Sequence, residues 1–165
     1  MLSLGALSKW LATTPLSHAI LTAKWVIPTL QTIHILGVAV VFSSAMLLNL
    51  RIFGLFEREE PLPAVTRRLL PAIWPVLGIL LLTGSLLIVA EPRRALINPT
   101  FVLKMGLLVA AVAVTAGLRS MLAPAAAGGT GRAEPVAGRA LAGLSVLLWC
   151  GILFAGRFIA YTQGG

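Results

Sequence analysis

A single histidine lies inside the longest uncharged apolar run of the chain, which extends from Trp25 to Leu50. As a helix, this run reaches about 39 Å, enough to cross ~30 Å of hydrocarbon with some tilt. The histidine, His34, falls roughly a third of the way along the run. An ionisable side chain is costly inside a membrane, so we expect His34 to face other helices and to belong to a functional site.

The lengths of the last two apolar segments predict that two cations lie within the membrane region. The uncharged run from Met105 to Leu118 reaches only about 21 Å as a helix, so spanning requires Lys104 to lie within the membrane region. The run from Ala140 to Gly156 is marginal in the same way and draws in Arg157. The sequence therefore predicts a cation inside one end of each of these helices.

The depths of these residues can be compared in an up-and-down arrangement of four spans. His34, Gly84, Lys104 and Arg157 then lie in the same half of the membrane. Further polar residues of that half are Gln31, Thr32, Thr83, Ser85, Glu91, Arg93 and Arg94. The opposite half contains mainly Asn49 and Arg51. We therefore expect a polar, cationic pocket in one leaflet, the outer one.

An imidazole in a cationic pocket suits a planar anionic cofactor such as haem b. Neutral imidazole ligates iron, and Lys or Arg side chains pair with the propionates. Glycines such as Gly84 would make room for the ring. The second axial ligand is left open between His18, if the N-terminal helix folds back over the bundle, and Met105. Without either, the iron is five-coordinate or the ligand is not haem.

Each of these residues also has a purely structural interpretation. His34 would then only hydrogen-bond to a neighbouring helix, and His18 would be a hydrated interfacial residue. Lys104 and Arg157 would extend to the lipid headgroups as anchors. Which interpretation holds depends on whether these side chains face the bundle interior.

The overall composition indicates a membrane protein. Of 165 residues, 58% are hydrophobic and 11% charged, and the mean hydropathy is +0.97. The net charge of +8 comes from cations scattered at the ends of apolar runs, which argues against nucleic acid as a partner. One cysteine, Cys150, excludes an intrachain disulfide. The chain has no Asp, no HExxH motif and no phosphate-binding loop, so whether it is an enzyme is left open.

The predicted architecture is an all-α membrane protein, a four-transmembrane-helix bundle with an N-terminal interfacial amphipathic helix. Residues 1–24 form the interfacial segment, with one helix over 2–12 and another starting at Pro15 after Thr14. Residues 25–161 form one domain, with spans at about 25–50, 69–90, 100–118 and 139–161. We expect a kink at Pro75, a polar turn from Glu91 to Asn98 and a flexible loop from Pro124 to Gly138.

The cations predict the orientation. Seven follow the first and third spans, and four lie on the other side. The seven are Arg51, Arg58, Arg67, Arg68, Arg119, Arg132 and Arg139, and the four are Lys9, Lys24, Arg93 and Arg94. The positive-inside rule then places both termini outside the cytoplasm. Lys9 and several polar residues interrupt the N-terminal segment, unlike a signal peptide, so we expect a multi-pass protein of a bacterial cytoplasmic (inner) membrane.

Several motifs resemble those of known families. The segments WLATTPLS, WVIPTLQTIHILG, LNLRIFG, NPTFVLK and LLWCGILFAGRFIAY together resemble a bacterial family of four-helix inner-membrane proteins, over nearly the whole chain. The HxxG of the first span, Arg51 and Lys104 are more distantly similar to the membrane domains of CopD-type copper-resistance proteins and HemJ-type protoporphyrinogen oxidases. This resemblance implies His34 as an axial ligand. The chain lacks the further histidines of HemJ, so the oxidase activity is not carried over.

These observations favour one function and leave two open. The first is a haem-b-binding, cytochrome-b-like protein that transfers electrons between a quinone or redox partner and the outer face. The second is a non-catalytic accessory subunit that packs on a larger membrane complex through small-residue helix faces. The third is CopD-like copper handling, because a Met-supported copper site is compatible with two histidines and one thiol. The lipid bilayer is the expected environment, and a homo-oligomer is left open.

Overall fold

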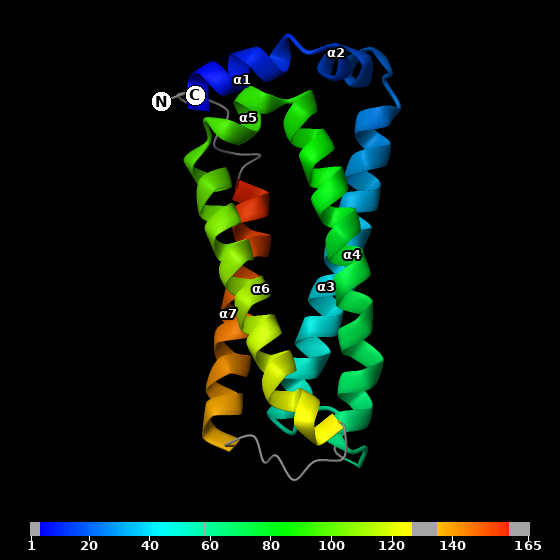
Figure 1. The fold of residues 1–165 in the computed structure, drawn as a ribbon, viewed down its shortest axis with the longest axis vertical. Coiled ribbons are helices and arrows are strands. Elements are labelled where there is room, and N and C mark those ends of the chain that lie inside the picture. Colours follow the sequence, from blue (N-terminus) through cyan, green and yellow to red (C-terminus); the bar gives the residue numbers. More distant parts are fainter. Residues whose placement is uncertain (1–3, 58, 127–134, 159–165) are drawn as a thin grey trace.

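The structure, a computed structural model, describes residues 4–57, 59–126 and 135–158. These residues form helices and no strands, which confirms the predicted all-α fold. Four helices are long and apolar enough to cross a membrane (Figure 1). They are α3 (Val26–Ile52), α4 (Leu62–Ala90), α6 (Pro99–Ala126) and α7 (Pro135–Phe158). The chain is therefore a multi-pass membrane bundle.

Two short N-terminal helices, α1 (Leu4–Ala12) and α2 (Pro15–Thr22), lie across one end of this bundle (Figure 1). Thr14 caps α2, because its hydroxyl accepts a hydrogen bond of 3.3 Å from the Ser17 amide. Ser17 and Ile20 of α2 are buried, whereas Trp10 and Leu16 are exposed. This end layer is thus two-sided, as expected for helices that lie in a membrane interface.

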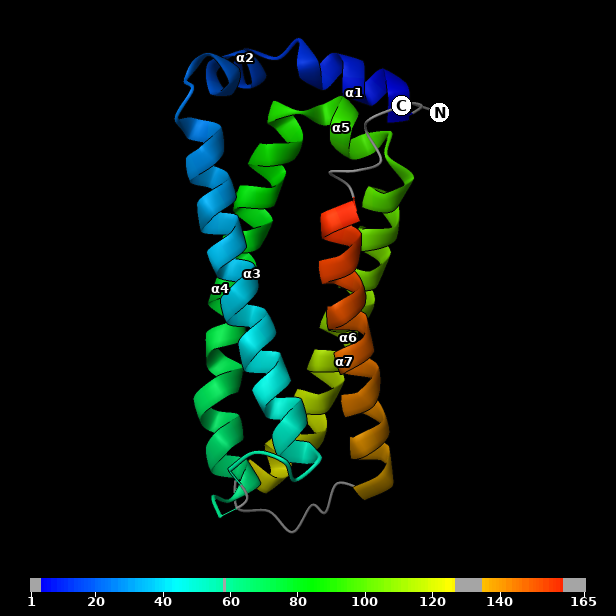
Figure 2. The same cartoon turned by 180° about the vertical axis from the view of Figure 1, so that it is seen from behind.

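The four long helices form two hairpins. α3 packs mainly against α4, and α6 mainly against α7 (Figure 2). The hairpins meet in one apolar core, whose buried residues are Val41, Ala45, Leu48, Ile73, Ala111, Leu122, Trp149 and Ile152. In both ribbon views the hairpins lie further apart beside α1 and α2 than at the opposite end. The shared core is therefore concentrated away from α1 and α2.

Several helices are longer than the predicted spans. α4 begins at Leu62 instead of residue 69, because Pro63 lies in the first helical turn, where the missing amide proton costs nothing. The helix continues through Pro75. The predicted loop from Pro124 to Gly138 is helical at both ends, since α6 extends to Ala126 and α7 begins at Pro135. The predicted turn after Glu91 contains the short helix α5 (Pro92–Leu96).

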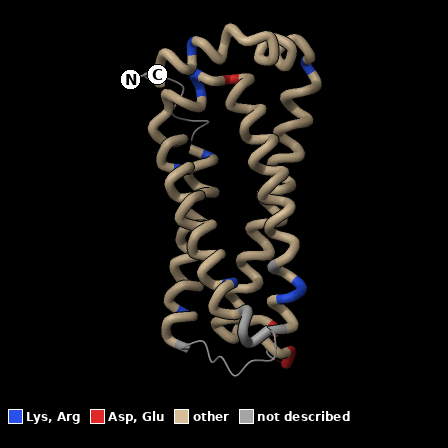
Figure 3. The backbone as a smooth tube through the Cα atoms, viewed as in Figure 1, with Lys and Arg blue, Asp and Glu red and all other residues tan. Residues whose placement is uncertain are grey.

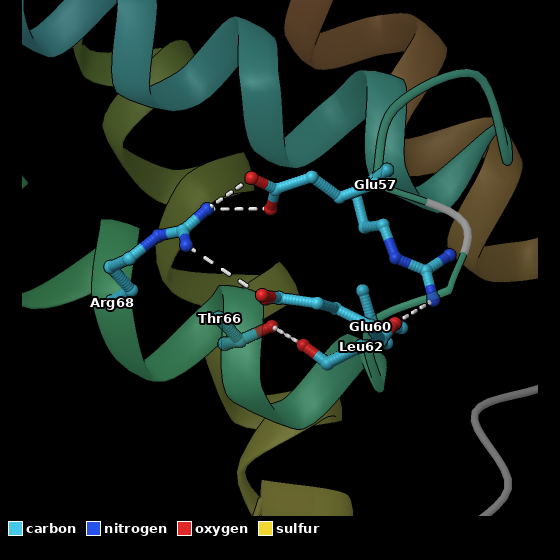
Figure 4. Close-up of polar contacts among 6 residues, drawn as sticks. Glu57, Glu60, Leu62, Thr66 and Arg68 are labelled. Atoms are coloured by element: carbon cyan, nitrogen blue, oxygen red, sulfur yellow. Dashed lines mark hydrogen bonds and ion pairs between the residues drawn. The ribbon is translucent and has the colours of Figure 1, made fainter.

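The cations gather towards the two ends of the bundle (Figure 3). At the end away from α1 and α2, two arginines also hold the loop between α3 and α4 (Figure 4). The Arg68 guanidinium contacts both carboxylate oxygens of Glu57, at 2.5 and 2.6 Å. Arg51 donates a hydrogen bond to the backbone carbonyl of Glu60. These arginines, expected only to set the orientation, therefore also shape this loop.

Candidate functional site

His34 projects from α3 towards α4 and is half-buried. Its Nδ1 lies 2.8 Å from the Thr83 hydroxyl of α4. A Cβ atom placed on Gly84 would lie 3.3 Å from His34 Cε1, so the imidazole rests against the α4 backbone at this glycine. The space above Gly84, which the sequence suggested for a cofactor ring, is therefore taken by the imidazole itself.

Gly37, one turn along α3, explains how closely the two helices approach. It is buried, and a Cβ atom there would lie only 2.9 Å from Leu80 Cδ2 of α4. The HxxG motif of the sequence thus has a physical basis. The glycine brings α3 and α4 close together, and the histidine one turn earlier reaches Thr83 and Gly84 across the contact.

Lys104 lies on the face of α6 that is buried within the bundle. It precedes the buried residues Ala111 and Leu122 by about two and five turns, so all three share one side of α6. A Cβ atom on Gly156 of α7 would lie 3.5 Å from the Lys104 Nζ. His34 lies eight residues after the start of α3 and Lys104 five residues after the start of α6, so both are in the half of the bundle next to α1 and α2. The two groups therefore lie at a similar depth, His34 beside Gly84 of α4 and Lys104 beside Gly156 of α7.

The face of α3 that points towards α7 is more exposed near α1 and α2 than at the other end. Gln31 and Asn49 are about five turns apart and lie on the same face of α3. Asn49 is buried against α7, where its amide donates to the Ser145 hydroxyl at 3.0 Å. Gln31 is exposed, although its face points in the same direction. The helix face that is closed by α7 at one end is therefore accessible at the end that contains His34.

The other predicted site residues are not gathered around His34. Arg157 is exposed and lies about 100° around α7 from Gly156, away from the buried face. Met105 is half-buried and lies about 100° around α6 from Lys104. Arg93 is exposed on α5. His18 is exposed on α2, on the side opposite the buried Ile20, so α2 does not turn it towards the bundle.

Two features of this site were missed by the sequence interpretation. Thr83 was expected only to line the pocket, but it is the direct partner of His34. Gly156 was not singled out, although it provides the surface beside Lys104. Its position one turn after the buried Ile152 was the available signal, because this spacing places a small residue on the inward face of α7.

The donor set sets limits on the chemistry. Among the described residues, no three His, Cys, Asp or Glu side chains come together in a way that would hold a metal ion. The apolar stretches 26–50, 69–90 and 99–126 contain no acidic residue at all. The site therefore offers one imidazole and one ammonium without a carboxylate in those helices, which suits an anionic molecule with at most one protein–metal bond from His34.

Comparisons with known proteins do not add to this picture. No family model, no curated protein and no solved structure matches the chain.

Proposed function

We propose that this protein binds haem b between its two hairpins and transfers electrons between a quinone or redox partner and the outer face of a bacterial inner membrane. The observation that carries the proposal is that His34 and Lys104 lie at a similar depth on two different hairpins. An imidazole whose Nδ1 contacts Thr83 and an ammonium from the other hairpin lie in the half of the bundle next to α1 and α2. A histidine nitrogen can ligate haem iron, and a cation can pair with a propionate.

The residues fit one half of a haem site well. His34 would supply one axial ligand, and Lys104 would pair with a propionate. Bound in this way, haem would supply a one-electron couple between its ferric and ferrous states. The second axial position has no donor from His18, which is exposed on the outer side of α2. Met105 lies about 100° around α6 from Lys104, so among the described residues only His34 is placed to bind the iron.

The proposed orientation rests on the cations. Arg51, Arg67 and Arg68 lie at the end of the bundle away from α1 and α2, and Arg119 and Arg139 occur near the ends of α6 and α7 that point the same way. An excess of cations favours the cytoplasmic side. His34 then lies in the outer half of the membrane, beneath α1 and α2.

An absorption spectrum of the purified full-length protein tests the proposal. Expressed with a haem supply and extracted in mild detergent, the protein is expected to show a Soret band, which His34→Ala removes. The matched control is His18→Ala, which replaces the only other histidine and should keep the band. A colourless wild-type protein that also fails to bind added hemin refutes the proposal. Copper found by elemental analysis instead would favour copper handling.

A second candidate function is supported by the outer surface of α3. A shallow groove there is lined by Leu36, Ala39, Val40, Ser43 and Ser44. Small residues let another helix approach closely in a membrane. A colourless protein that co-purifies in a fixed ratio with a larger membrane complex would therefore support the role of a non-catalytic accessory subunit.

A further inference from the structure

The contacts of Thr83 determine which nitrogen of His34 carries a proton. The Thr83 Oγ1 lies 2.8 Å from the backbone carbonyl of Ile79 and 2.8 Å from His34 Nδ1. Either distance is repulsive between two lone pairs and requires a hydrogen atom between the heavy atoms. A hydroxyl has only one proton to give. The carbonyl of Ile79 has none, so that proton must point to Ile79.

The second contact must then use a proton of the imidazole. Nδ1–H of His34 donates, and the Thr83 oxygen accepts. In a neutral imidazole only one nitrogen carries a proton, so Nε2 has a free lone pair. Gly84 supports this arrangement, because His34 Cε1 lies 3.3 Å from the point that a Cβ atom would occupy on this glycine, which sets the Nδ1–Cε1 edge of the ring against α4. Nε2 has no hydrogen bond to any described residue.

We infer that Thr83 is a positioning residue, which locks His34 in the Nδ1–H tautomer and presents the Nε2 lone pair to the interior between the hairpins. The two hydrogen bonds point the same way: the imidazole donates to the Thr83 hydroxyl, and the hydroxyl donates to the Ile79 carbonyl. This hydroxyl serves the same purpose as the carbonyl or carboxylate that fixes the tautomer of a metal-bound histidine elsewhere. The inference deepens the proposed function, because this lone pair is the ligand that haem iron would use.

The tautomer is a property of the chain alone, so it can be measured without any cofactor. The full-length protein, with His18→Asn so that His34 is the only histidine, is labelled with ¹⁵N-histidine and placed in lipid nanodiscs. Long-range proton–nitrogen spectra at neutral pH identify which ring nitrogen is protonated. We expect a protonated Nδ1 and an unprotonated Nε2. Thr83→Ser should keep this pattern, and Thr83→Val should lose it.

The matched control is Thr115→Val. Thr115 is as buried as Thr83, at 3% against 4% exposed, and its hydroxyl makes the same bond to a carbonyl one turn earlier, at 2.7 Å. It makes no contact with an imidazole, so the His34 spectrum should not change. Hemin titration gives a second measurement. Loss of such a supporting group typically weakens metal binding by about 10- to 100-fold, which we expect for Thr83→Val and not for Thr115→Val.

The outcomes separate the two proposals. A wild-type His34 with Nε2 protonated, or with both nitrogens protonated, overturns the role of Thr83 even if hemin binds. A Thr83→Val protein with the wild-type tautomer overturns it as well. If the Nδ1–H tautomer is present but hemin does not bind, the positioning role stands and the haem function fails. The wild-type spectrum alone can refute the inference. The test therefore remains decisive even if the Thr83→Val variant folds poorly.

Discussion

The side-chain amide of Asn49 on α3 donates a hydrogen bond of 3.0 Å to the Ser145 hydroxyl on α7. Both side chains are almost fully buried, and this bond joins the two hairpins at the end away from His34. The Asn49 Oδ1 has no hydrogen-bond partner among the described residues. A bond of this kind in a membrane interior fixes how the helices sit relative to one another.

Ser145→Ala should therefore destabilise the bundle, because it leaves the buried Asn49 amide without an acceptor. Interhelical hydrogen bonds in membranes are worth about 0.6 kcal/mol on average and up to about 1.7, so we expect a loss of roughly 1 kcal/mol. Reversible unfolding in mixed micelles measures it. Ser43→Ala, on the exposed face of α3, is the control and should change the stability little. Equal losses in both variants would contradict the prediction.

Gly37→Ala tests the close approach of α3 and α4. The added Cβ would lie 2.9 Å from Leu80 Cδ2 and 3.5 Å from Val76 Cγ1, so the Leu80 side chain must move. Overpacking of this kind costs about 1–3 kcal/mol, and we expect the lower end because a side-chain tip gives way. Gly78→Ala is the control, since nothing lies within 4 Å of its Cβ position. The idea fails if both alanines are tolerated equally in the same unfolding measurement.

Lys104→Met tests whether the ammonium pairs with a carboxylate of the ligand. Wild-type protein should bind hemin more tightly than hemin dimethyl ester, whose propionates are uncharged. A hydrogen bond to a charged group contributes about 1.5–3 kcal/mol, so the preference should be at least tenfold. Lys104→Met should remove the preference and leave ester binding nearly unchanged. Arg157→Met, at an exposed position, should keep it.

The orientation can be tested with the help of the single cysteine. In a Cys150→Ala background, Leu55→Cys places a thiol in the α3–α4 loop and Ile97→Cys places one near α5, at positions that are 68% and 54% exposed. A membrane-impermeant maleimide added to intact spheroplasts should label position 97 and not position 55. Both should react once the membrane is broken. Labelling at position 55 alone would reverse the orientation.

The sequence predicted how deep a residue lies in the membrane better than it predicted which side of its helix faces the bundle. Counting apolar residues placed Lys104 and Arg157 at a similar level within the membrane, but only Lys104 shares a helix face with buried residues. Arg157 lies about 100° away from the inward face of α7, since it is one residue after Gly156. Chain length alone carries no information about this angle. The spacing of Lys104 from Ala111 and Leu122, by contrast, does indicate that the three residues share one side of α6.

Helix ends were predicted less well for a different reason. Prolines at positions 63 and 135 suggested loops, yet proline is well accommodated in a first helical turn. The partner of His34 could not be derived either. Thr83, Gly84 and Ser85 are consecutive, and which of them faces His34 depends on the rotation of α4 about its axis. The contact of Gly37 with Leu80 sets that rotation, and it becomes visible only when the helices are packed.

His34 and Lys104 belong to different hairpins, and those hairpins are held together mainly by the core that begins about two turns away, around Val41, Ala111 and Trp149. The spacing between imidazole and ammonium is consequently governed from a distance. A small tilt of one hairpin about that core would change the separation of the hairpins beside α1 and α2 far more than it would disturb the core itself. Substitutions in the core, away from α1 and α2, would in this way change the separation of two groups that they do not touch.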